Sequence, residues 1–553
     1  MKKISTYLLL LATLAGGASC KKVLDQAPQL DYDETKVFGD IDLTNQFLTD
    51  VYAYTFTKPG NFMDIGNSTT GAGTEELDNS FGGTPVEKYQ NGSWSPNDNP
   101  DDIWAYTYRT IRKCNLLLQN LDKVPNKHAG QVTQSDLTPR RMKGEVFFLR
   151  AWNYWELLKR YGGVPIVTQP LDADSEVLRN ARRSSVDELV QFILKDLDSC
   201  SANAEIPLVW FGPDPNNPGK ELNRGNIGRA TKTLVKALKS RMLLYYASPL
   251  HNPDSAAAKW RNAAEISKSI LDDGKYTLAP IYQNVFLFTD NNEVLLSSNR
   301  AAFSEAIADP AGMGWGGTNP TQNMVDKYNM KNGKEITDAT SGYNPQDPYK
   351  DRDPRFYASI NYHGAVHKNV TLSMLPSGNQ DPAIGGDWSR TSYYMRKFQN
   401  ANNQSGVRRF FPIVRLAEIY LNYAEALNEA DGPVAEVYNA MNTLRRRAGI
   451  TEDLPAGMDK HEMRRRIRDE RAVELAFEKQ RFWDARRWKK GPEILGTDIY
   501  GVRVTRNGAG TLVYTYIRVE SRAFSDKMYL FPIPQSEIDK NPSILDQNKD
   551  WQK

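Results

Sequence analysis

Two tryptophans stand in stretches of the sequence that otherwise hold turn-forming and polar residues. Trp94 lies in "NGSWSPNDNP" with Asn97 and Asp98, and Trp315 lies between glycines in "GMGWGGTNP", followed by Asn319. Gly, Pro, Asn, Ser and Asp favour turns and solvated loops, so neither ring has a hydrophobic run to join. A flat ring beside amide and carboxylate groups suits a ligand with apolar faces and hydroxyl edges, such as a sugar. We predict that both rings are stacking platforms of a ligand site.

Acidic residues in the same loops add candidates for contacts with ligand hydroxyls. Glu75 and Asp78 lie in "GAGTEELDNS", and we predict that both accept hydrogen bonds from a ligand. Each prediction has a structural alternative. The acids could cap loop backbone, and Trp94 could fold back as a hydrophobic staple on Trp104 or Tyr108.

The residues around each apparent catalytic or metal-binding motif do not support that function. Gly312, Gly314 and Gly317 match GxGxxG, but no strand precedes them and "TNP" replaces the expected helix. His363 and His367 stand in a strand-and-turn pattern that puts their side chains on no shared helical face. The sequence contains neither G-x-S-x-G nor H-E-x-x-H. We therefore predict no catalytic residue, metal ligand or cofactor, although acid-rich loops leave bound calcium open.

Charge and composition narrow the class of protein. The chain has 553 residues and a formal net charge of +3, and no domain-sized region is strongly basic, so a nucleic-acid partner is not expected. Arginine-rich "RRRIRDERAVELAFEKQR" also carries acids four residues apart, Glu470, Glu474 and Glu478. That spacing predicts a salt-bridged helix face.

The N-terminus predicts export. Residues 1–19 combine "MKK", an apolar run and small residues that end at Cys20, which is typical of a secretory signal. A cysteine at this junction resembles a bacterial lipoprotein signal, in which Cys20 is lipidated and becomes the first residue. Cys114 and Cys200 then remain, too few for a disulfide framework. We expect free buried thiols, with a single bridge as the alternative.

Hydrophobic periodicity indicates a mostly helical chain behind a tether at residues 20–40. A helix is expected at about 43–54, and helical pairs at about 138–275 and 412–490. Thr138 before Pro139, and Ser185 three residues before Glu188, are helix-start signals. The pairs are similar to tetratricopeptide hairpins of irregular period. Two loop-rich insertions, 57–101 and 280–411, interrupt this frame and include a few short strands.

Several stretches, taken in order, resemble the SusD/RagB family of Bacteroidetes outer-membrane lipoproteins. After Cys20 and its tether come "IWAYTYRTIRKCNLLLQNL", "FLRAWNYWELLKRYGGVPIVTQPL", "YKDRDPRFYASI", "RRRIRDERAVELAFEKQRFWDARRW" and "YLFPIPQSEIDKNPSILDQN". Together they span nearly the whole chain that follows residue 19. The resemblance implies one SusD-like domain at residues 20–553 with a degenerate tetratricopeptide-like scaffold.

The resemblance also implies a function and a location. Such proteins are lipid-anchored on the outer membrane, face the exterior, and capture oligosaccharides for a partner TonB-dependent (SusC-like) transporter without catalysing a reaction. Their ligand aromatics lie on loops in the two insertions, which adds Tyr343 to the candidates. Capture of peptides by the same kind of protein and glycoside hydrolysis stay open as alternatives. The identity of the sugar, its linkage and its length cannot be read from the chain.

Overall fold

The computed structural model describes most of the chain after residue 32. The described residues are 33–59, 61–126, 137–172, 175–212, 224–289, 291–298, 309–310, 316–384, 388–407, 410–540 and 546–551. Residues 1–19, Cys20 and Trp315 lie outside them, so their predicted roles stay predictions. No helix among these residues has the length and apolar character needed to cross a bilayer.

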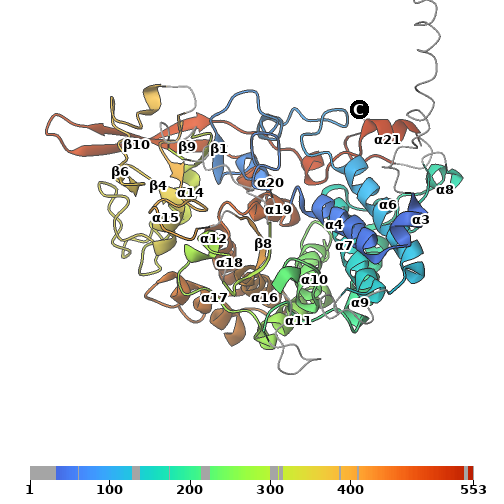
Figure 1. Cartoon of the computed structure of the whole chain (residues 1–553). Helices are drawn as coiled ribbons and strands as arrows, with labels where there is room; N and C mark the ends of the chain where they lie inside the picture. The colour runs from blue at the N-terminus through green and yellow to red at the C-terminus, as the bar shows by residue number, and fades with distance from the viewer. Residues whose placement is uncertain are drawn as a thin grey trace, which may run out of the picture.

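Long helices form a continuous frame along one side of the molecule (Figure 1). They are α4 (Ile41–Phe56), α6 (Trp104–Asn120), α7 (Pro139–Tyr161), α9 (Val186–Ala202), α10 (Lys232–Ala247), α11 (Ala257–Asp273), α16 (Leu416–Asp431), α17 (Ala435–Ala448) and α18 (Lys460–Glu474). Helix α7 packs between α6 and α9, and α11 packs between α10 and α16. The prediction of a mostly helical fold with a few short strands is confirmed, and its tetratricopeptide-like character stays a prediction.

Helix-start signals in the sequence act as predicted. The Thr138 side chain accepts the N–H of the residue three positions on at 3.0 Å, and Pro139 opens α7. Ser185 and Glu188 form a reciprocal capping box on α9, with bonds of 3.1 and 2.7 Å. These bonds satisfy N–H groups that the first turn of a helix leaves without partners. Cys114 and Cys200 are both buried free thiols, so the alternative of a bridge is wrong.

Short elements make up the two insertions. The first contains η2 (Thr70–Gly73), β1 (Leu77–Asn79) and α5 (Glu87–Asn91). The second contains α12 (Asn284–Leu287), β2 (Val294–Ser297), β3 (Thr318–Pro320), α14 (Gln322–Lys327), α15 (Pro354–Ser359), β4 (Ile360–Asn361), β5 (Val366–His367), β6 (Val370–Thr371), η5 (Pro382–Ile384) and β7 (Tyr394–Met395). The pairs β1–β3, β4–β7 and β5–β6 are antiparallel, and β2 pairs with β8 (Pro412–Arg415) just before α16.

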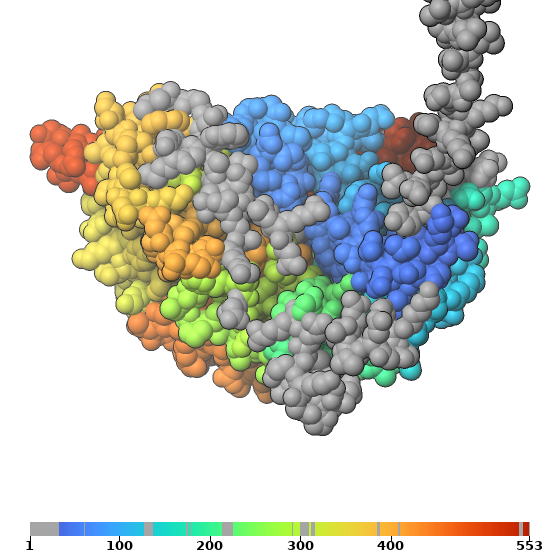
Figure 2. Space-filling model, viewed as in Figure 1, coloured from blue at the N-terminus to red at the C-terminus, as the bar shows by residue number. Residues whose placement is uncertain are grey.

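The C-terminal part returns to the first insertion. After α18 come α19 (Gln480–Arg487), α20 (Gly491–Ile494), the hairpin β9 (Ile499–Arg506) and β10 (Leu512–Glu520), η6 (Asp526–Tyr529) and α21 (Gln535–Lys540). The hairpin projects from the body at the left of Figures 1 and 2. Beyond it, the N–H of Ala523 donates to the carbonyl of Gln90 at 2.8 Å, and the N–H of Gln535 donates to Pro96 at 3.1 Å. Through these bonds the C-terminal segment covers one side of the first insertion.

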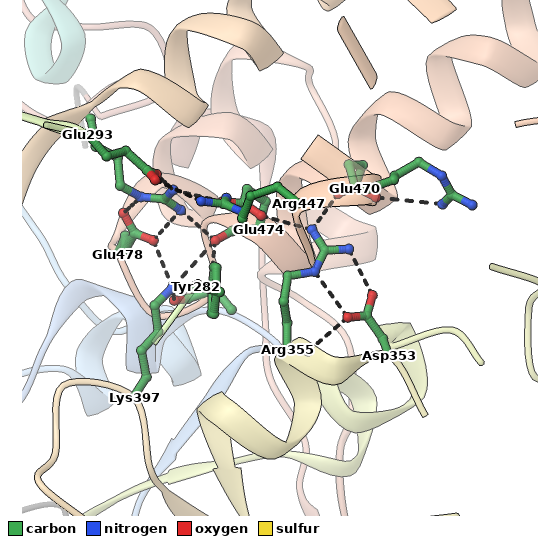
Figure 3. A network of polar contacts seen from close by, with 12 residues as sticks. Tyr282, Glu293, Asp353, Arg355, Lys397, Arg447, Glu470, Glu474 and Glu478 are labelled. Atoms are coloured by element: carbon green, nitrogen blue, oxygen red, sulfur yellow. Dashed lines mark hydrogen bonds and ion pairs between the residues drawn. The ribbon is translucent and has the colours of Figure 1, made fainter. Parts of the chain in front are cut away.

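Buried charges fix the base of the second insertion to the last helices (Figure 3). Arg415 donates to Glu293 at 2.8 Å, to Glu474 at 2.7 Å and to Glu478 at 2.8 Å. Arg447 on α17 pairs with the same Glu293 and Glu474. All five side chains are buried or nearly so. Each carboxylate therefore has a cationic partner in a region that water does not reach.

A third arginine extends this group. Arg355 at the start of α15 donates to Asp353 at 2.8 Å and to Glu474 at 2.9 Å, and it also pairs with Glu470. We call the group of Glu293, Asp353, Arg355, Lys397, Arg415, Arg447, Glu470, Glu474 and Glu478 the charge network. Burial alone would raise the pKa of Glu474, but Arg447, Arg415 and Arg355 hold it far below its ordinary value.

The charge network corrects one expectation. The three glutamates are salt-bridged, as predicted, but they are buried, and Glu478 lies beyond the end of α18. Their partners come from α15, from Lys397, from Arg415 ahead of α16 and from α17, not from arginines one turn away on the same helix. A spacing of four residues reveals pairs within one helix, and it cannot show which distant segment packs on the face.

Candidate functional site

The two insertions meet where β1 pairs with β3. Asp78 lies opposite Asn319 in this register, and the N–H of Ser80 donates to the carbonyl of Gly317 at 2.8 Å. A Cβ atom on Gly317 would lie 1.9 Å from the ring of Phe81, so only glycine allows this close approach. Residues predicted separately in the two loops are thus brought side by side.

A pocket opens beside this junction. Its volume is about 200 Å³, and we call it the insertion pocket. It is lined by Asn79, Ser80, Phe81, Gly82, Glu87, Gln90, Asn91, Arg390, Glu520 and Ser521. The lining comes from the loop around α5, from the second insertion and from the end of β10. Amides, hydroxyls, carboxylates, one guanidinium and one aromatic ring therefore converge on a small space.

Arg390 forms one wall of the insertion pocket, and its side chain is 43% exposed. It donates to both carboxylate oxygens of Asp78, at 3.0 and 2.5 Å, and at 3.1 Å to the carbonyl of Asn79 and to Glu520. Burial raises the pKa of Asp78, and Arg390 opposes that rise. Asp78 itself has no exposed surface, which contradicts its predicted direct contact with a ligand; it holds Arg390 in place.

Several acceptors at the junction lack partners among the described residues. The amide nitrogen of Asn79 donates to the carbonyl of Phe81 at 3.0 Å and to Thr84 at 2.7 Å, while its Oδ1 atom accepts no bond. The side-chain oxygens of Thr318 and Asn319 are likewise unfilled. A buried acceptor without a donor is costly. These oxygens have almost no exposed surface, so they belong to the packed junction and not to the open part of the insertion pocket.

The structure contradicts the prediction that Trp94 is an open platform. Its ring is only 2% exposed. It packs edge-to-face on Tyr89, Phe531 and Trp551, with ring centroids 4.7–5.0 Å apart. The structural alternative is therefore correct in placing Trp94 in the core. These partners belong to α5 and the C-terminal segment, however, and not to α6, where the staple alternative places them.

The remaining predicted residues at this junction and in the first insertion divide between buried and exposed positions. Glu75 is buried and accepts two bonds from Arg481 of α19, at 2.6 and 2.9 Å, so its predicted contact with a ligand is wrong for this fold. Asn97 and Asp98 are exposed, and Asp98 pairs with Lys88. Neither of these two lines the insertion pocket. Asn319 is fully buried and bonds to Ser80 and to the carbonyl of Gly316, at 2.7 and 2.6 Å.

A buried acid lies next to Glu75. Glu76 is 1% exposed, and one of its carboxylate oxygens has no partner among the described residues. Burial, followed by the charge of Glu75, raises the pKa of Glu76 to about 8, although Arg481 acts in the opposite direction. Glu76 is therefore a neutral carboxylic acid at pH 7 in the folded protein.

Tyr343 belongs to a second aromatic region, beside the projecting hairpin. Tyr516 on β10 is 48% exposed, and its hydroxyl donates to Asp326 at 3.1 Å and accepts from Gln322 at 3.0 Å. Burial is the main cause of a raised pKa of Tyr516, and the neighbouring Asp326 and Tyr343 raise it further. Tyr343 is half-buried. We call the rings of Tyr343, Tyr500, Tyr514 and Tyr516 the tyrosine surface.

Tyrosines of this region lie a short distance from the insertion pocket along one strand. Glu520 ends β10 and lines the pocket, and Tyr516 stands four residues earlier. At about 3.3 Å per residue, the two positions are about 13 Å apart along β10. A ligand longer than one ring could therefore reach both.

Sequence reasoning missed Phe81 and Arg390 as lining residues. Phe81 precedes two glycines in "NSFGGTP", the same ring-beside-glycine pattern that singled out Trp315. That signal could have identified it. Arg390 in "DWSRTSYY" carries no comparable local pattern. Its role depends on Asp78, which is remote in the sequence.

A larger groove, with a volume of about 890 Å³, lies on the frame between residues 166–171, α8 (Glu176–Arg179) and α9. Its lining is mixed, and no residue of either insertion contributes to it. It therefore brings together none of the predicted ligand contacts.

Comparison with known proteins gives a consistent result. The family model described as "SusD family" matches residues 279–551, and the one described as "Starch-binding associating with outer membrane" matches residues 24–211. SusD-like protein P25 of Formosa agariphila is 25% identical over 70% of each chain. A SusD-like protein from Bacteroides fragilis is 28% identical, with a TM-score of 0.74 over 94% of this chain and 98% of the other.

Another solved structure from Bacteroides fragilis, of a SusD-like carbohydrate-binding protein, is 22% identical, with a TM-score of 0.73 over 93% of this chain and all of the other. A helical frame with a polar pocket between two loop-rich insertions has the organisation of a binding protein. This chain belongs to the SusD family.

Proposed function

We propose that this protein captures glycans in the insertion pocket. One observation carries the proposal: the two insertions bring an aromatic ring, a guanidinium group and amide side chains to a single cavity of about 200 Å³. The ring of Phe81 offers a face for the apolar side of a sugar, while Arg390 donates to hydroxyl oxygens and the exposed amide of Asn91 accepts a hydroxyl proton. The tyrosine surface adds contacts for longer chains.

Lipid anchoring completes the proposed role. Cys20 follows a secretory signal, and one matching family model is named for association with the outer membrane. We propose that lipid on Cys20 holds the protein at the outer membrane, facing the exterior. From there it passes its glycan to a TonB-dependent transporter of the SusC type.

The proposed capture proceeds without hydrolysis. Glu520 already accepts hydrogen bonds from Arg390 and Arg522, at 3.1 and 2.9 Å, so the protein itself holds this carboxylate.

A pair of glycine substitutions tests the site. Gly82 lines the insertion pocket and a Cβ atom there would meet nothing within 4 Å, so Gly82→Leu fills the pocket without strain. Gly508, in the turn of the β9–β10 hairpin, is equally unhindered, and Gly508→Leu is the matched control. Calorimetry and affinity electrophoresis with neutral polysaccharides should show at least about tenfold weaker binding for Gly82→Leu alone, about 1.4 kcal/mol.

Other results would contradict the proposal. Equal binding by the two variants would place the site elsewhere. Binding of peptides in place of every polysaccharide would favour the peptide-capturing alternative, and release of shortened sugars would establish a hydrolase.

A further inference from the structure

We propose that the insertion pocket selects uncharged glycan segments and discriminates against segments that carry carboxylate or sulfate groups. This inference rests on the proposed glycan-binding function and adds the chemical class of the ligand. It follows from the balance of charged groups around the pocket and from the bonds that those groups already make.

Carboxylates outnumber cations at the insertion pocket. Glu87 and Glu520 line it, and Asp78 lies directly behind Arg390. Glu87 accepts only the N–H of Thr84, at 3.3 Å, among the bonds within the described residues. Among the described residues no cation is paired with Glu87, so its negative charge faces the insertion pocket and is not neutralised.

Both guanidinium groups are already neutralised. Arg390 is held by Asp78 and Glu520, at 2.5 and 3.1 Å. Arg522 is buried and donates to Glu520 at 2.9 Å and to the backbone carbonyls of Thr74 and Leu77. Three carboxylates and two guanidiniums leave one net negative charge.

The nearest lysine along the chain does not change this balance. Lys88 follows Glu87 in α5, but its ammonium group pairs with Asp98. An arginine in a pocket often selects an anion. Here Arg390 supplies hydrogen-bond donors, while the protein carboxylates Asp78 and Glu520 neutralise its positive charge. Hydroxyl groups can use those donors at no electrostatic cost, whereas an anionic substituent would meet a negative field.

The experiment compares three forms of one glucan by calorimetry with the full-length protein. The first is a water-soluble neutral glucan, the second is the same glucan oxidised at C6 to carboxylates, and the third is the oxidised glucan converted to its uncharged amide. We expect the carboxylated form to bind at least about tenfold more weakly than the neutral form. The amide should recover most of the loss, because it keeps the shape of the carboxylate without its charge.

Salt and one substitution sharpen the test. Raising NaCl from about 20 mM to about 300 mM should reduce the difference in affinity between the neutral and the carboxylated glucan, because ions screen the repulsion between the pocket and the carboxylates. Glu87→Gln should improve binding of the carboxylated form about threefold relative to the neutral form, since one charge close to the ligand is lost. The control is Glu436→Gln, which removes an exposed charge on α17 outside the pocket and should leave the ratio unchanged.

The possible failures can be told apart. Equal or tighter binding of the carboxylated glucan, weakened by salt, would overturn this inference and leave glycan capture intact. Failure of the amide to recover binding would also overturn it, because shape and not charge would then be responsible. Absence of binding by all three forms, repeated across other neutral polysaccharides, would overturn the proposed function itself.

Discussion

The charge network and the insertion pocket contain the same types of charged side chain, but in the first these residues are buried and in the second they line an open cavity. Both join the second insertion to another part of the chain through arginines and carboxylates. In the charge network every acid is paired and the group is buried, as the contacts of Arg415 show. In the insertion pocket Arg390 is 43% exposed, and Glu87 has no cationic partner among the described residues. Saturated, buried contacts fix a backbone, whereas partly unfilled contacts in an open pocket are available to a ligand.

Removal of a charge-network residue should have the largest effect on stability. Glu474→Ala leaves Arg355, Arg415 and Arg447 buried with fewer partners, so we expect a loss of about 3–5 kcal/mol in the free energy of unfolding. Urea unfolding measures this loss. Glycan affinity of the folded variant at low temperature should stay within about twofold of the parent, since the insertion pocket is untouched.

Glu436→Ala is the matched control, because Glu436 is exposed on α17. Its free energy of unfolding should change by no more than about 0.5 kcal/mol. A strong loss of glycan affinity in well-folded Glu474→Ala would break the distinction between the two regions.

Glu76 should give the next largest effect, and a pH-dependent one. Its pKa of about 8 lies above the ordinary value, so the folded protein keeps a proton there that the unfolded chain releases. The contribution of Glu76 to stability is therefore present below about pH 4.5 and falls as the pH rises toward 8.

Glu76→Gln has no carboxyl group at this position, so its stability should not fall in this way as the pH rises. The difference in free energy of unfolding, variant minus parent, should rise by an amount on the order of 3 kcal/mol between pH 5 and 7.5. Urea titrations at several pH values measure it. A difference independent of pH would show that Glu76 is ionised in the folded protein.

The smallest predicted effect on stability tests whether Trp94 is a core residue or a ligand contact. Trp94→Phe keeps an aromatic group against Phe531 and Trp551 but leaves unfilled volume, so we expect a loss of about 2 kcal/mol in unfolding free energy. Affinity for glycans, measured by calorimetry, should remain within about twofold. A stable variant that no longer binds would restore Trp94 as a ligand contact.

Local chemistry in the sequence identified the helices and the family. Thr138 before Pro139, and the capping box of Ser185, depend on residues within one helical turn, which is why a single sequence reveals them. The motif order that resembles the SusD/RagB family is also readable along the chain.

Long-range packing decided the site residues, and the sequence does not show it. Trp94 sits in a polar loop, but Trp551 and Phe531 from the far end of the chain cover it. Asp78 is buried, and its role depends on Arg390, which only the folded chain brings near. Loop composition predicts where a ligand region lies and not which side chains remain open.

The most direct test is the structure of the protein in complex with a neutral oligosaccharide that binds in solution. The account predicts a sugar ring over Phe81, with one hydroxyl donating to the amide oxygen of Asn91 and another accepting from Arg390. A sugar bound only in the groove beside α8 and α9, or only on the tyrosine surface, would contradict it.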